Sequence, residues 1–502
     1  MRMMGRLLLV AVVAVVGFSL VVRAQEPAPG DAELQFQLGT LLFDEARYRE
    51  SLVAFDRATR GADPTLVVRA RKGKIRSALR IAEFTMARLE GDVLRQEAPG
   101  DAEALALYGD TLWSAGWFDE SDAYYAAALE ADADSPRGRF GLARSLASRR
   151  QLDQALVEAE RALELSPQDG EIHAIVAEIY EREHDFARAA EFYRRYAELL
   201  PASATSEKAA WARARIRFLE AFEGREPVAI DAEDEAMLHT VPFRLVNDKV
   251  VVRASINGGP QQDFVLDTGS EETILSEETA FVRGIAPITR TLSAGVGEMG
   301  LRGLQLGRLD SLSIGTLQVR NLPVLIKNPA LQGVPRLEGD AFSPLSLGMS
   351  MLIDYQNNTL TIGRRLPEGN PDFRLPMRVN RLALVRGVLN GSHPAYFVVD
   401  TGGEVISISQ QTAGALEMPP VRRIPLQVWG SSGWDPDAFL LPGVHLAFGD
   451  IAYENYPTVV LNLRTPSALL GFQLGGILGH KFLSPYRVTL DMELGELRLE
   501  RF

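Results

Sequence analysis

The chain has 502 residues. A single hydrophobic core usually organises fewer residues than this, so we expect at least two domains. Its formal net charge of −13 argues against binding to nucleic acid or to anionic lipid. The chain contains no cysteine, which excludes disulfides, a thiolate nucleophile and cysteine-ligated metal sites.

The first 24 residues carry the features of a secretory signal. Arg2 and Arg6 precede an apolar run from Leu7 to Val22, and the small-residue pattern that ends at Ala24 fits a cleavage site. We therefore predict an exported protein, periplasmic or secreted, with a signal peptide over 1–24. The alternative is an uncleaved N-terminal anchor, although the run is shorter than the roughly 20 residues that span a bilayer. No later segment has the composition of a membrane span, so we expect none after signal removal.

Residues 32–222 are rich in Ala, Leu, Arg and Glu with helical periodicity, and they repeat every 34 residues. Small or aromatic residues recur at fixed offsets, as in Gly39, Ser51, Phe55 and Ala58; Gly109, Ser121, Tyr125 and Ala128; Ala143, Ala155, Ala159, Ala162 and Pro167; and Ala177, Tyr180, Ala189, Tyr193 and Pro201. This pattern resembles the tetratricopeptide repeat. We count about five repeats, with 66–100 as a degenerate unit and 206–222 as a terminal capping helix.

The resemblance implies an all-α solenoid whose concave groove holds a peptide or a partner protein. A scaffold without a specific partner is the alternative, because the matching residues explain only how the helices pack. The acidic stretch over 223–240 contains Pro227 and is interpreted as a linker. From there to the C-terminus, short Val, Ile, Leu and Phe runs alternate with Gly, Asn and Pro turns, which predicts an all-β region.

One passage of the β region occurs twice. Residues 264–270 read Phe-Val-Leu-Asp-Thr-Gly-Ser, and residues 397–403 read Phe-Val-Val-Asp-Thr-Gly-Gly. An Asn-Gly turn precedes each copy, and each copy leads to a terminal hairpin that contains an aspartate, Asp354 or Asp491. Downstream, 337–342 matches 477–482, in which Ile-Leu-Gly is the clearest element. The β region is therefore predicted to contain two copies of one fold.

The duplicated passage resembles the pepsin-like and retropepsin-like aspartic proteases over about 241–502. The resemblance implies a two-lobed acid-protease domain, with lobe 1 over 241–366 and lobe 2 over 372–502, and a catalytic pair formed by Asp267 and Asp400. It also implies that Thr268 and Thr401 bond across to the partner loop, while Gly269 and Gly402 bring backbone N–H groups close to the carboxylates. No metal and no cofactor is expected, and the six histidines have no spacing that suits a metal site.

Two carboxylates a few ångströms apart cannot both ionise cheaply, so one pKa rises and the other falls. The ionised member then takes a proton from a water that attacks the scissile carbonyl, and the protonated member donates toward the carbonyl oxygen. Ser270 follows the first motif where Gly403 follows the second. Because Ser270 has a hydroxyl that could stabilise an ionised Asp267, whereas Gly403 has no side chain to do the same for Asp400, we hypothesise that Asp267 is the more acidic member.

Glycines about 30 residues beyond each aspartate suggest mobile flaps over a bound peptide. The candidates are Gly295 and Gly297 in lobe 1, and Trp429 and Trp434, which flank a Gly-Ser-Ser-Gly turn, in lobe 2. The lobe 1 candidate lacks the tyrosine of pepsin-like flaps. Trp434 supplies contact area to a substrate or packs on its own hairpin. Glu338 is a second departure, because an aliphatic residue is expected there beneath the first loop.

Two functions remain open from the sequence. In the first, the chain is an exported aspartic endopeptidase that cleaves polypeptides as a monomer, with repeats that bind a protein partner or orient the substrate. In the second, it is a peptide-binding or assembly protein that uses a protease-like fold without cutting. A third arrangement, in which each lobe pairs with another molecule, is distinguished by the mass of the isolated β region.

Overall fold

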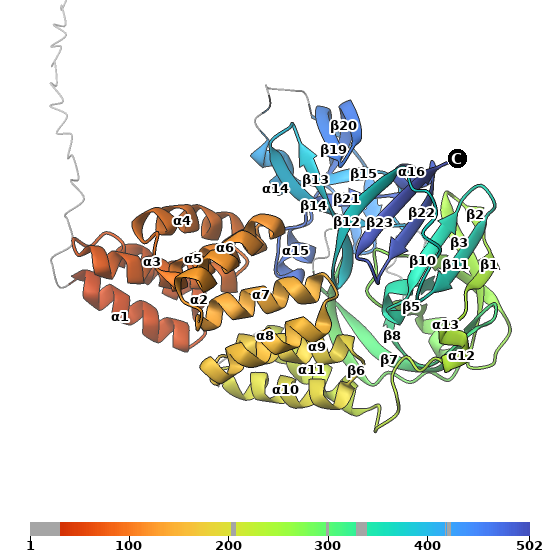
Figure 1. Cartoon of the computed structure of the whole chain (residues 1–502), viewed down its shortest axis with the longest axis horizontal. Coiled ribbons are helices and arrows are strands. Elements are labelled where there is room, and N and C mark those ends of the chain that lie inside the picture. Colours follow the sequence, from red (N-terminus) through yellow and green to blue (C-terminus); the bar gives the residue numbers. More distant parts are fainter. Residues whose placement is uncertain (1–30, 202–206, 298–300, 328–338, 417, 419–422) are drawn as a thin grey trace, which may run out of the picture.

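The computed structural model describes residues 31–201, 207–297, 301–327, 339–416, 418 and 423–502 (Figure 1). The predicted signal peptide at 1–24 lies outside the described residues. A helical part, from α1 to α11, is followed by a β-rich part that runs to the C-terminus. The predicted fold class, an all-α repeat region followed by an all-β two-lobed region, is confirmed. Within the described ranges, none of the helices combines the length and the apolar character that crossing a bilayer requires.

The helical part consists of consecutive helix pairs, each packed against the next along the chain. Their bounds are α1 Asp31–Asp44, α2 Tyr48–Ala58, α3 Pro64–Arg80, α4 Phe84–Glu97, α5 Ala102–Ser114, α6 Phe118–Ala131, α7 Pro136–Ser148, α8 Leu152–Leu165, α9 Gly170–Arg182 and α10 Phe186–Leu199. The 66–100 segment, which fits the repeat pattern poorly, forms the pair α3 and α4. A further helix, α11 Glu207–Glu220, packs on α10.

Small residues let aromatic rings enter between the helices. A Cβ added at Gly39 would lie 2.8 Å from the ring of Phe55, and one at Gly109 would lie 2.6 Å from the ring of Tyr125. Both rings are buried, so a larger side chain at either glycine would displace them. The residues that define the sequence repeat are therefore the ones that set the spacing of its helices.

The 223–240 segment, interpreted as a linker from sequence, packs on lobe 1. The N–H of Val228 donates to the carbonyl of Asn321 at 3.2 Å, and Ala229 forms a β-bridge with Arg320. Arg320 also forms an ion pair with Asp231 at 2.8 Å. A short helix, α12 Ala232–Glu235, leads from there into the first strand. The segment thus has fixed contacts with the β region that its composition does not indicate.

Lobe 1 contains strands β1–β11 and lobe 2 contains β12–β23. The lobe 1 elements are β1 His239–Pro242, β2 Arg244–Val246, β3 Lys249–Ile256, β4 Gln262–Leu266, β5 Thr273–Ser276, α13 Glu277–Val282, β6 Thr289–Ala294, β7 Leu301–Ile314, β8 Leu317–Lys327, β9 Ala341–Phe342, the 3-10 helix Pro344–Leu347, β10 Ser350–Asp354 and β11 Thr359–Gly363. The lobe 2 elements are β12 Phe373–Asn380, β13 Leu382–Leu389, β14 His393–Val399, β15 Ile406–Ser409, α14 Gln410–Ala415, β16 Ile424–Pro425, β17 Val428–Gly430, β18 Gly433–Asp435, β19 Phe439–Phe448, β20 Ile451–Leu461, α15 Arg464–Leu470, β21 Gly476–Leu478, α16 His480–Leu483, β22 Tyr486–Asp491 and β23 Glu496–Arg501.

The two lobes share one topology. Lobe 1 contains the strand order β3-β4-β9-β5-β8-β7, and lobe 2 contains the matching order β13-β14-β21-β15-β20-β19. In each lobe the strand that leads to the Asp-Thr-Gly passage pairs in parallel with a short downstream strand, β9 or β21. The internal duplication seen in the sequence is therefore a duplication of structure.

A sheet with strand order β1-β11-β10-β22-β23-β12 joins the lobes. Its central step pairs β10 of lobe 1 with β22 of lobe 2 in antiparallel register, with Met351 opposite Leu490 and Ile353 opposite Val488. These side chains belong to one continuous hydrophobic core that includes residues of both lobes. The lobes of one chain are therefore partners of each other.

The repeats contact lobe 2 through a buried ionic and aromatic interface. Arg378 of β12 donates to Asp119 at 2.6 Å and to Asp122 at 2.5 Å, both on α6. The ring of Phe118 lies 4.7 Å from that of Tyr396 and 5.1 Å from that of Phe472, measured between centroids. This interface fixes the repeat region against lobe 2.

We expect Arg378→Met to lower the free energy of unfolding by about 1–3 kcal/mol, because it removes the buried cation that Asp119 and Asp122 share and leaves each with one less-buried partner, Arg386 or Arg149. The estimate lies below that for a fully buried pair because Asp119 is 42% exposed. Urea unfolding of the full chain measures the change. Arg374→Met on the same strand removes an exposed cation that pairs with Glu496, and it should have a much smaller effect. Equal effects of the two substitutions would contradict the assignment.

Candidate active site

The two Asp-Thr-Gly passages lie at the ends of equivalent strands, β4 and β14. The N–H of Asp267 donates to the carbonyl of Phe342 at 3.0 Å, and the N–H of Asp400 donates to the carbonyl of Leu478 at 3.0 Å. Each aspartate is therefore fixed by the short strand beneath its loop. The two loops meet where the lobes face each other.

The two threonines link the loops by a reciprocal exchange of hydrogen bonds. The hydroxyl of Thr268 donates to the carbonyl of Val399 at 2.6 Å and accepts from the N–H of Thr401 at 3.0 Å. The hydroxyl of Thr401 donates to the carbonyl of Leu266 at 2.6 Å and accepts from the N–H of Thr268 at 3.1 Å. Both side chains are fully buried, so these bonds have no competition from water.

The glycines let the carboxylates approach the opposite loop. A Cβ at Gly269 would lie 2.5 Å from Oδ1 of Asp400, and one at Gly402 would lie 2.8 Å from Oδ1 of Asp267. Any side chain at these positions would therefore displace a carboxylate. The N–H of Gly269 donates to Oδ1 of Asp267 at 3.0 Å, and the N–H of Gly402 donates to Oδ1 of Asp400 at 2.8 Å.

Burial raises the pKa of Asp400. Hydrogen bonds from the N–H groups of Gly403 and Gly402, and a side-chain hydrogen bond with Asp267, lower this pKa and offset part of the rise. The hypothesis that Ser270 makes Asp267 the more acidic member finds no support in the contacts. The hydroxyl of Ser270 donates to the carbonyl of Glu272 at 2.9 Å. The hydroxyl of Ser270 therefore stabilises its own loop rather than the carboxylate of Asp267. In the second loop, the N–H of Gly403 donates to Oδ1 of Asp400 at 3.0 Å.

The strand beneath the first loop differs from the one predicted. The sequence match placed 337–339 opposite Ile477-Leu478-Gly479, but the hydrogen bond from Asp267 to Phe342 makes 341–343 the equivalent segment. The predicted match is therefore wrong by four residues, because Ser343 takes the place of the glycine that guided it. Glu338 lies outside the described residues, and its apparent departure from the pattern followed from the shifted match.

The two flap candidates contact each other. The N–H of Gly295 donates to Oγ of Ser432 at 2.9 Å, and the N–H of Ser432 donates to the carbonyl of Val296 at 2.9 Å. Gly297 has a φ of +135° beside the backbone of Ser432, where a side chain would clash. The tips from both lobes thus meet.

Trp429 and Trp434 form a cross-strand pair in the β17–β18 hairpin. Their ring centroids are 5.1 Å apart at an interplanar angle of 61°. Of the two interpretations of Trp434, packing on its own hairpin is the one that the structure supports. Trp429 is 44% exposed.

A cavity of about 1890 Å³ extends from Asp400 and the loop that follows Asp267 to the helices of the repeat region. It is larger than the roughly 300–1,000 Å³ of pockets that hold small molecules. From the β region it is lined by Gly269, Asp400 and Gly295, and from the repeats by residues of α5, α7, α9 and α11. This volume suits a polypeptide segment.

Three family models match separate parts of the chain. The model described as "gag-polyprotein putative aspartyl protease" matches residues 252–354, the model described as "Aspartyl protease" matches 385–482, and a tetratricopeptide-repeat model matches 112–179. The chain joins a tetratricopeptide-repeat region to two aspartyl protease domains. The protease matches contain Asp267 in one case and Asp400 in the other.

Solved structures of other proteins are similar to part of this chain at low identity. A thermophilic tetratricopeptide-repeat protein of Thermus thermophilus is 18% identical, with 37% of this chain and 98% of that chain covered and a TM-score of 0.31. PilF of Pseudomonas aeruginosa is 17% identical, with 39% and 86% covered and a TM-score of 0.28. YrrB, described as having an unusual peptide-binding site, is 17% identical, with 36% and 92% covered and a TM-score of 0.23. The search of curated proteins gives no match.

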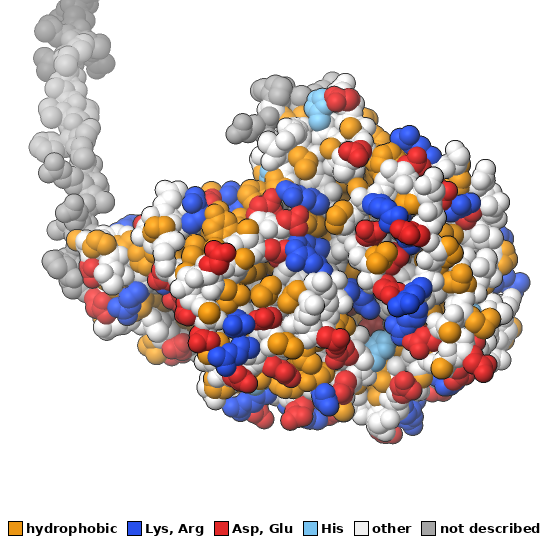
Figure 2. Space-filling view, viewed as in Figure 1, with side chains coloured by type: hydrophobic (Ala, Val, Ile, Leu, Met, Phe, Trp, Pro, Cys, Tyr) orange, Lys and Arg blue, Asp and Glu red, His pale blue; other side chains and the backbone are white. Residues whose placement is uncertain are grey.

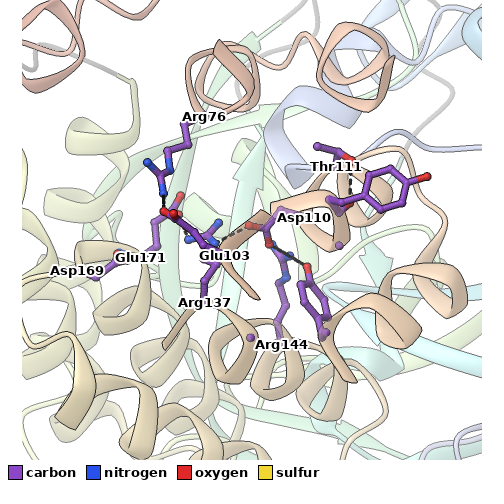
Figure 3. Close-up of polar contacts among 12 residues, drawn as sticks. Arg76, Glu103, Asp110, Thr111, Arg137, Arg144, Asp169 and Glu171 are labelled. Atoms are coloured by element: carbon purple, nitrogen blue, oxygen red, sulfur yellow. Dashed lines mark hydrogen bonds and ion pairs between the residues drawn. The ribbon is translucent and has the colours of Figure 1, made fainter. Parts of the chain in front are cut away.

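Several charged side chains that line the groove of the repeat region pair with one another. Asp110, which is buried, accepts from Arg144 at 2.9 Å and from Arg137 at 2.5 Å, and Arg137 donates onward to Glu171 at 2.6 Å (Figure 3). Acidic and basic side chains are likewise interspersed on the face that Figure 2 shows. Within the described residues, no group of three or more His, Asp or Glu side chains is placed to hold a metal ion.

Lys249, at the start of β3 in the first protease domain, was missed by the sequence reasoning. Its Nζ donates to the carbonyl of Gly402, and its positive charge lowers the pKa of Asp400. The equivalent strand of the second domain, β13, begins with Leu382. The sequence signal that could have identified Lys249 is the charge at the start of β3, where the matching strand β13 begins with an apolar residue.

We expect Lys249→Met to raise the pKa of Asp400, because the substitution removes a cation that favours the ionised carboxylate. The limb of the pH–rate profile that reports loss of the shared proton should therefore move to higher pH. Peptide cleavage measured across the pH range checks the direction. A limb that stays in place, or moves to lower pH, would contradict the role of Lys249, and Lys481→Met, which removes an exposed cation paired with Glu404, is the control.

Proposed function

We propose that the chain is an exported aspartic-type endopeptidase that hydrolyses polypeptides with Asp267 and Asp400 as its catalytic pair. The observation that carries the proposal is the meeting of the two carboxylates, one from each protease domain, on loops that line a peptide-sized cavity. Both aspartates come from one chain, which supports catalysis by a monomer. The apolar N-terminal sequence supports export.

In the proposed reaction Asp400, whose pKa is raised, holds the shared proton, and Asp267 is ionised. Asp267 takes a proton from a water held between the carboxylates as the water oxygen bonds to the scissile carbonyl carbon. Asp400 donates its proton to the carbonyl oxygen, which gives a neutral gem-diol. Asp400 then takes back a hydroxyl proton while Asp267 protonates the departing nitrogen, and the C–N bond breaks.

The first test is cleavage of a diverse peptide library by the purified full chain from pH 3 to pH 8. The same assay is run with a transition-state-mimicking inhibitor of aspartic proteases. Inhibitor-sensitive cleavage supports the endopeptidase. Peptide binding without cleavage at any pH would instead favour a non-catalytic peptide-binding protein. Sequencing the N-terminus of the protein recovered from an extracytoplasmic fraction tests the predicted cleavage of 1–24.

A further inference from the structure

The loop that follows Asp267 carries two consecutive glutamates that face different partners. Glu271 accepts from Arg381, in the turn between β12 and β13 of lobe 2, at 2.9 Å from Nε and 2.8 Å from Nη2. Glu272 lies 3.6 Å from Nη2 of Arg215, on helix α11 of the repeat region. The repeats therefore reach a residue only five positions after the first aspartate.

Arg215 lies between two carboxylates. It pairs with Glu181 of α9 as well as with Glu272, and its guanidinium lies 5.3 Å from the ring centroid of Phe218. The side chains are mostly buried, with 15% of Arg215, 13% of Glu181 and 9% of Glu272 exposed. An ion pair shielded in this way is screened less by salt than a surface pair.

The loop is thus held from three sides. The hydroxyl of Ser343 in lobe 1 donates to the carbonyl of Ser270, Arg381 of lobe 2 holds Glu271, and Arg215 of the repeats faces Glu272. The same loop supplies Gly269, whose N–H donates to Asp267. Gly269, Glu272 and Arg215 all line the shared cavity.

We propose that Arg215 is a positioning residue for peptide hydrolysis, so that helices α9 and α11 of the repeat region form part of the peptide site. The inference rests on the proposed function. Arg215 acts through Glu272 on the 270–272 loop, and through that loop on Gly269 and Asp267. A tethered recruitment module would have no such contact with the catalytic loop.

The contact has an electrostatic consequence that can be measured. Burial raises the pKa of Glu272 to about 7, the charges of Arg215 and Arg381 oppose the rise, and Glu271 adds to it. Removal of Arg215 therefore raises the pKa of Glu272 further. A substitution that merely loosened the helices would not move this titration in that direction.

The experiment compares Arg215→Gln, Arg215→Lys and Arg194→Gln in the full chain. Arg194 pairs with Glu220 on the exposed side of the repeats, so it is a control for the loss of one arginine. We expect Arg215→Gln to lower kcat by on the order of 10-fold, because small displacements of reacting groups are costly. KM should change less than kcat. The inflection near pH 7 in the pH dependence of kcat, which reports the titration of Glu272, should move to higher pH. Arg215→Lys should restore most of the lost kcat and reverse most of the shift in the inflection.

The inference would be overturned if Arg215→Gln had the same kcat, the same KM and the same inflection as the wild-type chain. So would an equal loss of kcat in the Gln and Lys variants with the inflection unmoved, since that result indicates structural loosening. If Arg215→Gln does not fold, Glu272→Gln replaces it, and this variant must lose the inflection near pH 7 for the inference to stand. Absence of cleavage by the wild-type chain would overturn the proposed function itself, whereas cleavage that is insensitive to Arg215 overturns this inference alone.

Discussion

Replacement of either aspartate by asparagine, Asp267→Asn or Asp400→Asn, is expected to lower kcat for peptide cleavage by at least about 10²–10⁴-fold. An amide of the same shape can neither take a proton from water nor return it. Because the two carboxylates act as a unit, the double variant should be about as active as either single variant. Single-turnover cleavage of a fluorogenic peptide, selected from the library, measures the loss.

The matched control is Asp263→Asn, on β4, the strand that leads to Asp267. Asp263 is exposed and pairs with Arg244 at 2.7 Å, so its loss should leave kcat unchanged. The melting temperature of each variant separates loss of chemistry from loss of fold. Substantial activity in one aspartate variant but not in the other would show that only one carboxylate is essential and would refute the shared-proton mechanism.

Thr401→Val is expected to lower the free energy of unfolding by about 2–6 kcal/mol and to reduce cleavage at the same time. The substitution keeps the shape of the side chain but leaves the carbonyl of Leu266 and the N–H of Thr268 without their partner. Each buried group that loses its hydrogen bond costs about 1–3 kcal/mol. Urea unfolding and the cleavage assay measure the two effects.

Thr401→Ser is the control, because it keeps the hydroxyl and removes one methyl group. We expect it to lower the free energy of unfolding by only about 1 kcal/mol. Activity should survive, since the hydroxyl still joins the two loops. If the Ser and Val variants were equally destabilised, packing of the methyl group rather than the hydrogen-bond exchange would account for the stabilising role of this threonine.

Repetition is what made the site predictable from sequence. The two Asp-Thr-Gly passages have matching flanks, and the structure brings Asp267 and Asp400 together at the ends of matching strands. The downstream strand of lobe 1 was misplaced because β9 has only two residues, Ala341 and Phe342, and lacks the glycine seen in the second copy. A strand that short carries no periodic signal.

The contacts between the repeats and the β region could not be predicted in the same way. Arg378 pairs with Asp119, and Arg215 pairs with Glu272, across long stretches of chain. Periodicity and composition report on local structure, whereas these pairs depend on how the two parts dock. The fixed contacts of the 223–240 segment were missed for the same reason, since an acidic, proline-containing segment is typical of a linker until its partner strand β8 is known.

The pairing of β10 with β22 also affects how the protein is made. β10 is complete once the first lobe has been synthesised, but the strand that covers its edge comes close to the C-terminus. A first lobe that folds early therefore presents an uncovered strand edge, which is a template for pairing with other chains. The same pairing joins parts of the chain that lie far apart in the sequence, and such long-range contacts slow folding. Truncation of the last 20 or so residues would thus create an aggregation-prone protein rather than a one-lobed enzyme.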